Sequence, residues 1–216
     1  MAKNGSKLQK TKTQSFYDRI AEIHNLTLKV NGYRASVAKF LRSLELEVDS
    51  DSRVLDAGCG TGLVTLGFYD AGFKPGKTIA LDLSGQSLKL AMEQFHKEEK
   101  VDSKNVVPVQ GNVLHLPFED GSFDLVFSCG VLEYCPLDDG LREMSRVLKP
   151  SGRLVFIPVK PSIVGTVLEL LYNFKTHSLD SVRSTAKQYF NIVGNYKFPS
   201  VEPIAWSKAI FLLEKK

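Results

Sequence analysis

The sequence predicts an α/β fold: a doubly wound, mostly parallel sheet with helices on both faces. From residue 53 onward, short runs that are apolar throughout alternate with helical segments, and such runs are typical of parallel strands that are buried on both faces. A cluster of glycines directly follows the first run. Since open parallel sheets bind ligands beyond the carboxyl ends of their strands, this cluster marks the expected site.

Two helices are expected before the sheet, because "SFYDRIAEIHNLTLKV" and "GYRASVAKFLRSLEL" space their apolar residues three and four apart. The predicted strands are Arg53–Asp56, Thr78–Leu83, Asn105–Gln110, Phe123–Ser128 and Arg153–Val159. The helices between them are Leu63–Ala71, Ser87–Glu99 and Gly140–Leu148. Further on, Pro161–Phe174 and "SLDSVRSTAKQYFNIV" are interpreted as helices, and "AWSKAIFLLEKK" as a final strand.

Length and composition fit one globular domain after a short tail. Of the 216 residues, 43% are hydrophobic and 24% charged, as in ordinary globular proteins. Four lysines within residues 1–12 account for the whole net charge of +4, and the rest of the chain is neutral. We therefore expect a basic, disordered tail over 1–12 and one domain over 13–216.

Partner and compartment follow from what the sequence lacks. No apolar run approaches the length of a membrane span, and the N-terminus has no apolar core, so a cytoplasmic protein is expected. No basic stripe interleaved with aromatics indicates a nucleic-acid groove. Peripheral membrane contact through the basic tail stays open, and a solvated tail is favoured. The three cysteines and the acidic residues show no metal-ligand spacing, so no metal is expected.

The stretch "VLDAGCGTG" carries the chemistry. Gly58, Gly60 and Gly62 allow positive φ and leave space for a ligand against bare backbone. Asp82 ends the second strand, where an acid accepts hydrogen bonds from a ribose diol. Asp56 suits an ammonium or sulfonium better than a pyrophosphate, and Leu63 stands where a dinucleotide fingerprint has glycine. A phosphate-free, cationic nucleoside is indicated, and S-adenosylmethionine meets that description.

Four motifs in order carry a family resemblance: "VLDAGCGTG", "IALDLSGQSLKLA", "VQGNVLHLPFEDGSFDLVFS" and "LREMSRVLKPSGRLVF". Together they resemble the class I S-adenosylmethionine-dependent methyltransferases, particularly the branch of ubiquinone and menaquinone C-methyltransferases. The resemblance spans roughly residues 53–158. It implies a Rossmann-like, seven-stranded sheet, with helices over the site in 13–48, a cofactor-binding core in 53–160, and lid helices and final strands in 161–216.

The resemblance also implies roles in holding S-adenosylmethionine. Asp56 would lie near the methionine end, the Gly58–Gly60 backbone would face methionine and ribose, Asp82 would hold the ribose hydroxyls, and Leu83 would pack on adenine. Asn112 and Val113 stand where the family usually has Asp-Ala beside adenine, so Asn112 is a departure. The complete predicted cofactor set is Asp56, Ala57, Gly58, Cys59, Gly60, Asp82, Leu83, Asn112, Val113, Ser128 and Cys129.

Methyl transfer from a sulfonium is an in-line displacement that needs alignment and exclusion of water more than a catalytic signature. The predicted substrate-side residues are Tyr17, His24, Glu133 and Tyr134. Glu133 is interpreted as a base or a cation ligand, with a surface salt bridge as the equal alternative; packing is favoured for Tyr134. Cys129 is interpreted as a small residue at a strand end rather than a nucleophile, because no histidine partner is evident.

The predicted function is therefore transfer of a methyl group to a small molecule, one that the apolar cover over 161–200 suggests is lipophilic. A protein that binds S-adenosylmethionine without catalysis is the alternative, supported by Asn112. A nicotinamide-dependent oxidoreductase is disfavoured by Leu63 and Asp56. The acceptor, the atom methylated, any base and the oligomeric state are not determined by the sequence.

Overall fold

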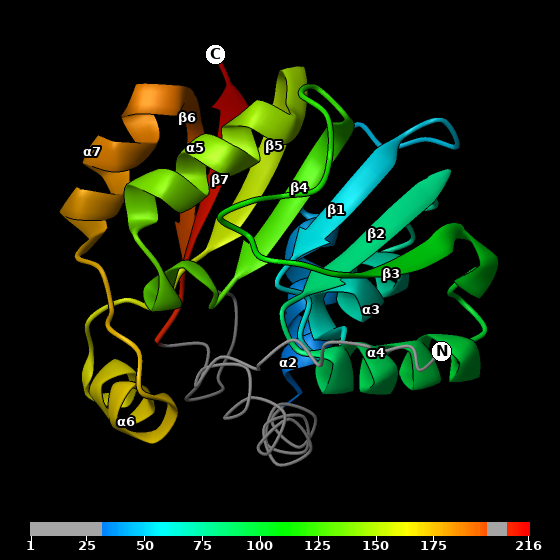
Figure 1. Cartoon of the computed structure of the whole chain (residues 1–216), viewed down its shortest axis with the longest axis horizontal. Coiled ribbons are helices and arrows are strands. Elements are labelled where there is room, and N and C mark those ends of the chain that lie inside the picture. The colour runs from blue at the N-terminus through cyan, green and yellow to red at the C-terminus, as the bar shows by residue number, and fades with distance from the viewer. Residues whose placement is uncertain (1–31, 198–206) are drawn as a thin grey trace, which may run out of the picture.

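The computed structural model describes residues 32–197 and 207–216. These residues form one seven-stranded sheet of order β3-β2-β1-β4-β5-β7-β6, in which β7 runs in the direction opposite to the other six strands (Figure 1). The strands are β1 Arg53–Ala57, β2 Lys77–Asp82, β3 Val106–Gln110, β4 Phe123–Cys129, β5 Leu148–Ile157, β6 Phe190–Lys197 and β7 Ala209–Lys215. The predicted doubly wound, mostly parallel sheet is confirmed.

Helices cover both faces of the sheet. Their bounds are α2 Tyr33–Arg42, α3 Leu63–Asp70, α4 Gly85–Lys97, α5 Leu137–Val147, α6 Ile163–Tyr172 and α7 Leu179–Tyr189, with short 3-10 turns η1 Ser103–Asn105 and η2 Leu132–Tyr134. One apolar layer joins α2, α3 and α4 to the sheet, and a second joins α5 and α7 to its other face. Figure 1 shows α6 beyond the ends of the strands rather than on either face.

The buried strands alternate their side chains between these two layers. Val54 of β1 packs with α2, α3 and α4, whereas the next residue, Leu55, packs with α5 and α7. Both are fully buried. A strand that buries both faces forms an unbroken apolar run, and this is why β1, β2 and β4 could be predicted from the sequence to within about one residue.

Two predicted boundaries are wrong. The segment expected to be a helix through Val193 ends at Tyr189, and Phe190 begins β6. β5 begins at Leu148, five residues earlier than expected, because it pairs with Phe123 across an irregularity in the β4 register. The expected tail over 1–12 and the expected first helix lie outside the described residues. Within the described ranges, no helix is long and apolar enough to cross a bilayer.

The topology places the site. β1 lies between β2 and β4, and the chain leaves β1 toward one side of the sheet and returns to β4 on the other. Ligands bind to open α/β sheets at such a reversal, beyond the carboxyl ends of the strands. The residues that follow β1, β2 and β4 therefore meet where a ligand is expected.

Candidate functional site

The turn between β1 and α3 has a backbone that only glycine adopts readily. Gly58, Gly60 and Gly62 have φ of 81°, 54° and 85°, in the left-handed region that disfavours side chains. A Cβ on Gly58 would lie 2.3 Å from Cγ2 of Val131, whereas a Cβ on Gly60 would have no atom of the described residues within 4 Å. Gly58 is thus required by packing, and Gly60 presents bare backbone to open space.

Asp82 connects this turn to the turn after β2. Its Oδ2 accepts a hydrogen bond of 2.8 Å from the Gly60 amide, and its Oδ1 accepts one of 2.8 Å from the Ser84 amide. The amides of Gly58 and Cys59 both donate to the Leu81 carbonyl. These bonds fix the carboxylate at the edge of the glycine turn, where the sequence predicted a ribose-binding acid.

Asp56 is a buried acid beneath the same turn. It is 1% exposed, and its Oδ2 accepts a 2.6 Å hydrogen bond from Thr65 Oγ1 of α3. Burial, reinforced by the negative charge of Asp82, raises the pKa of Asp56 to about 7. A cation beside Asp56 would favour its charged form, so this carboxyl group is suited to a positively charged ligand.

The residues predicted to lie beside adenine follow β2 and β3. Val113 is buried in the layer that includes α5, and Leu83 is half-buried after the end of β2. Asn112 is exposed, and its Oδ1 accepts a 3.0 Å hydrogen bond from the Leu114 amide. The oxygen expected to meet the adenine amino group thus already stabilises a turn. Gln110, which was not predicted, reaches back to donate to the Leu83 carbonyl at 3.0 Å.

The carboxyl end of β4 gathers polar groups from distant parts of the chain. Ser128 is fully buried, and its Oγ has no hydrogen-bond partner among the described residues. Cys129 Sγ lies 3.0 Å from the hydroxyl of Tyr33 on α2. Lys208 Nζ would lie 3.1 Å from a Cβ on Gly130. Burial raises the pKa of the Cys129 thiol, which keeps it protonated and agrees with the expectation that it is not a nucleophile.

Glu133 lies inside the protein, so the alternative of a surface salt bridge is wrong. The η2 turn directs it inward, where it is 5% exposed and one of its oxygens, Oε1, accepts a hydrogen bond from the Val159 amide. The other oxygen, Oε2, has no partner in the described part of the chain. A buried carboxylate oxygen without a partner is costly, and such groups occur where a ligand or a proton is handled.

Tyr134 packs, as the sequence favoured: its ring meets that of Phe174 edge-on at 5.3 Å. The segment after α6 is fastened to η2 by two more contacts. The Lys175 amide donates to the Glu133 carbonyl at 3.2 Å, and His177 Nε2 lies 3.0 Å from the Leu132 carbonyl. The lid region is therefore attached directly to the turn that carries Glu133.

Sequence reasoning missed two residues here and named two that the structure does not describe. Tyr33 and Lys208 were not singled out, because nothing in their local sequence distinguishes them from ordinary helix and strand residues. The hydroxyl of Tyr33 is buried, and burial raises its pKa well above its usual value. Tyr17 and His24 lie outside the described residues.

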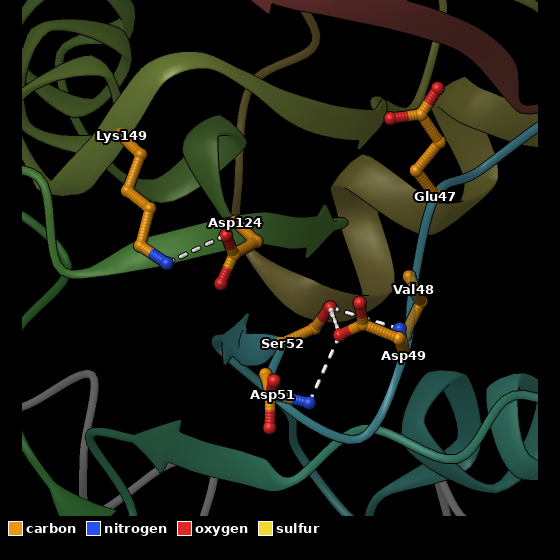
Figure 2. A pocket seen from close by; sticks show the side chains of 7 residues that line it. All are labelled: Glu47, Val48, Asp49, Asp51, Ser52, Asp124 and Lys149. Atoms are coloured by element: carbon orange, nitrogen blue, oxygen red, sulfur yellow. Dashed lines mark hydrogen bonds and ion pairs between the residues drawn. The ribbon is translucent and has the colours of Figure 1, made fainter.

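A separate hollow of about 410 Å³ lies at the opposite edge of the sheet, where β1 and β4 begin. Figure 2 shows that Asp124 points to Lys149, and that Asp49 holds its own turn through Ser52 and the Asp51 amide. Asp124 also accepts from the Arg53 amide at 2.8 Å. These carboxylates stabilise the amino ends of the strands and are remote from the glycine turn.

The sheet order and the glycine turn define a Rossmann-like α/β protein, and comparison with known proteins specifies it further. A family described as "Methyltransferase domain" matches residues 55–156. Demethylmenaquinone methyltransferase of Lactiplantibacillus plantarum is 35% identical over 140 residues, which cover 64% of this chain and 56% of that protein. The uncharacterized protein MJ0638 of Methanocaldococcus jannaschii is 35% identical over 175 residues, covering 77% and 70%. The chain belongs to the class I S-adenosylmethionine-dependent methyltransferase family, as predicted, and S-adenosylmethionine is the cofactor of that family.

Solved structures show the same fold at low identity. Geranyl diphosphate C-methyltransferase of Streptomyces coelicolor has a TM-score of 0.70 at 17% identity, covering 83% of this chain and 75% of that one. The [4+2]-cyclase SpnF has a TM-score of 0.74 at 17% identity, covering 96% of each chain. The chain spans 56% of the length of the demethylmenaquinone methyltransferase of Lactiplantibacillus plantarum. It spans 40% of the length of the demethylmenaquinone methyltransferase of Lactococcus lactis.

Proposed function

We propose that this protein transfers a methyl group from S-adenosylmethionine to a small, lipophilic acceptor. One observation carries the proposal. The glycine turn presents bare backbone at Gly60, with Asp82 hydrogen-bonded to it and the buried Asp56 beneath it. Such a site offers two carboxyl groups and no lysine or arginine from the turn itself, which suits a cationic nucleoside and disfavours a phosphate.

The residues proposed to hold the cofactor form three groups, which would contact its methionine end, its ribose and its adenine ring. Asp56 and the Ser128 hydroxyl would bind the charged methionine end, and Asp82 would bind the ribose hydroxyls. Leu83 and Val113 would bound the adenine ring, with Asn112 at its edge. Because the Asn112 oxygen is already bonded to the Leu114 amide, we propose that this side chain contributes little to adenine binding. Backbone from Ala57 to Gly60 completes the site, together with Cys129.

When bound, S-adenosylmethionine supplies an electrophilic methyl group on a positively charged sulfur. The work left to the protein is to align the acceptor, exclude water and remove a proton where the acceptor has one. We propose Glu133 Oε2 as the base, since it is buried and without a hydrogen-bond partner in the described residues. Lys208, near the end of β4, would stabilise the negative charge that develops on an acceptor losing its proton.

The acceptor is proposed to be lipophilic and to have an ionisable hydroxyl or carbon acid. Support comes from the apolar helix α6 beside the site and from curated relatives named demethylmenaquinone methyltransferase. A base with a neighbouring cation suits an acceptor that forms an enolate or phenolate as its proton leaves. A substituted naphthoquinol is a suitable first acceptor to assay.

The experiment is release of S-adenosylhomocysteine from S-adenosylmethionine with a naphthoquinol as acceptor. We expect Glu133→Gln to lower kcat by about a hundredfold or more, with little change in cofactor affinity. Glu119→Gln, an exposed acid at a distance from the site, is the matched control and should behave as the wild type. Equal rates for the two variants would contradict the role of Glu133.

A second candidate is a protein that binds S-adenosylmethionine without transferring its methyl group. The engaged oxygen of Asn112 favours it. The cyclase SpnF has the same fold, so the fold alone does not decide between the two. Calorimetric binding of S-adenosylhomocysteine, together with no turnover across a panel of quinols, phenols, thiols and amines, would support this candidate.

A further inference from the structure

The helix α6 presents its apolar side chains outward. Ile163, Val167, Leu170 and Leu171 are 89%, 50%, 81% and 61% exposed in the described structure, and they are four of its six exposed large hydrophobic residues. Their spacing of four, three and one places them within a single arc of the helix. We call these four residues the α6 apolar face. Scattered exposed apolar residues need no explanation, but a contiguous set does.

The opposite side of α6 is the packed one, and it holds the half-buried Val164, Leu168 and Tyr172. Gly165 is the one buried residue of the helix, and a Cβ there would lie 2.5 Å from the Lys160 carbonyl. Glu169, also on this side by helical spacing, accepts hydrogen bonds from the Thr176 amide and hydroxyl at 2.6 and 2.7 Å. A surface helix of an ordinary globular protein presents polar residues to solvent, whereas α6 is apolar on both sides. The outward face of α6 is therefore suited to contact with an apolar partner.

The charges around α6 indicate what covers it. The helix carries one charged residue, Glu169, and that residue is engaged on the packed side. Lys160 precedes the helix and Lys175 follows it, so a cation flanks each end of the apolar face. Four more lysines occur in residues 1–12 of the sequence. An apolar strip with flanking cations matches the interface of an anionic bilayer, where acyl chains meet negative headgroups.

The attachment of α6 holds the helix beside the turn that carries Glu133. The Ser162 hydroxyl caps the start of the helix through the Gly165 amide at 2.9 Å, just after the Glu133–Val159 bond. At its other end, Phe174, Lys175 and His177 contact η2. Figure 1 shows α6 at the end of the sheet where β4 and β5 finish. A surface bound by α6 would thus lie beside the proposed acceptor site.

We propose that the α6 apolar face docks onto an anionic phospholipid bilayer and brings the acceptor site to the membrane surface. With ten residues, about 15 Å of helix, α6 is too short to span a bilayer and fits a position in the plane of the interface. This inference rests on the proposed function for its acceptor, since a lipophilic acceptor would be taken from the bilayer. The docking itself does not depend on the proposed function, because it requires only the α6 apolar face and the flanking lysines.

The test is co-sedimentation of the full-length chain with vesicles of phosphatidylcholine and phosphatidylglycerol, compared with phosphatidylcholine alone. Val167→Asp and Val193→Asp form a matched pair, because both valines are 50% exposed and Val193 lies on β6. We expect the wild type and Val193→Asp to bind the anionic vesicles. Val167→Asp and Leu170→Asp should bind about tenfold more weakly or worse.

Several results would overturn the docking proposal. One is failure of the wild type to bind anionic vesicles; another is undiminished binding by Val167→Asp and Leu170→Asp, which would assign the contact to the N-terminal lysines. A wild-type dimer that Leu170→Asp converts to a monomer would make a second copy the partner. If Leu170→Asp lowers the thermal stability and the wild type does not bind vesicles, then another segment of this chain covers the α6 apolar face. Calorimetry with S-adenosylhomocysteine tests the proposed function separately, since neither substitution touches the glycine turn.

Discussion

Replacing Asp56 with asparagine should stabilise the folded protein above neutral pH while weakening its binding of S-adenosylmethionine. Burial raises the pKa of Asp56 from an ordinary value of 3.8 to about 7. Between those values the unfolded chain has lost this proton and the folded chain keeps it, so unfolding releases a proton and stability falls as pH rises. Above the folded pKa the loss is complete and constant.

The size of this loss in the free energy of unfolding follows from the difference between the pKa values of Asp56 in the unfolded and the folded chain. A rise from 3.8 to about 7 corresponds to about 4 kcal/mol, at about 1.4 kcal/mol for each pKa unit. Asparagine carries no charge and can keep the acceptor for Thr65 Oγ1, which removes this loss. Its buried amide N–H groups would cost about 1–3 kcal/mol if unpaired. The expected net gain in the free energy of unfolding at about pH 8 is therefore about 1–3 kcal/mol, with no gain at about pH 4.

Urea denaturation of the wild type and Asp56→Asn across this range measures the effect, with the exposed Asp51→Asn as control. Calorimetry should show that the wild type binds S-adenosylmethionine more tightly as pH rises through about 7, because ionised Asp56 attracts a cation. That component should be absent in Asp56→Asn, whereas the titration of the ligand's own amino group is common to both proteins. A variant that loses stability with pH as the wild type does would refute this account of Asp56.

Three further predictions concern the turn, the core and the helix layer. Gly58→Ala should lower the free energy of unfolding by about 2 kcal/mol or more, because its φ is strained and its Cβ would meet Val131 at 2.3 Å; Gly60→Ala should lower it by only about 1 kcal/mol and act mainly on S-adenosylhomocysteine affinity. Phe127→Ala, which removes a 1% exposed core ring, should lose about 3–5 kcal/mol in urea denaturation. Arg34→Met should lose about 1–2 kcal/mol in the same assay, because Arg34 joins acids on α3 and after α4 at 2.6 and 2.5 Å. A Gly60→Ala variant less stable than Gly58→Ala, or Phe127 and Arg34 variants as stable as the wild type, would contradict these assignments.

The central strands could be predicted from the sequence because the features that define them depend on neighbouring residues. Strands buried on both faces must be apolar throughout, and the turn after β1 needs glycine wherever a residue with φ above zero is required. β6 was missed for a related reason. It is an edge strand that begins at Phe190 directly after α7, with no glycine or proline between them, so its apolar residues extend the helical pattern.

The candidate site was predictable only where its residues follow a strand. Asp56 and Asp82 could be singled out because the ends of parallel strands meet at one edge of the sheet, and Glu133 was singled out through the family resemblance. The contact of Tyr33 with Cys129 joins residues 96 positions apart, and Lys208 reaches Gly130 from the other end of the chain. No sequence spacing encodes such pairings. The burial of Glu133 likewise depends on the η2 turn and on the Val159 amide, which the local sequence does not specify.

We expect the turn after β1 to bind a cationic nucleoside that carries no phosphate. Calorimetric titration of the full chain with S-adenosylmethionine and, in parallel, with NAD tests it most directly. We expect saturable binding of S-adenosylmethionine, which is lost in Asp82→Ala, and no binding of NAD. A folded protein that binds NAD, or that binds neither compound, would contradict it.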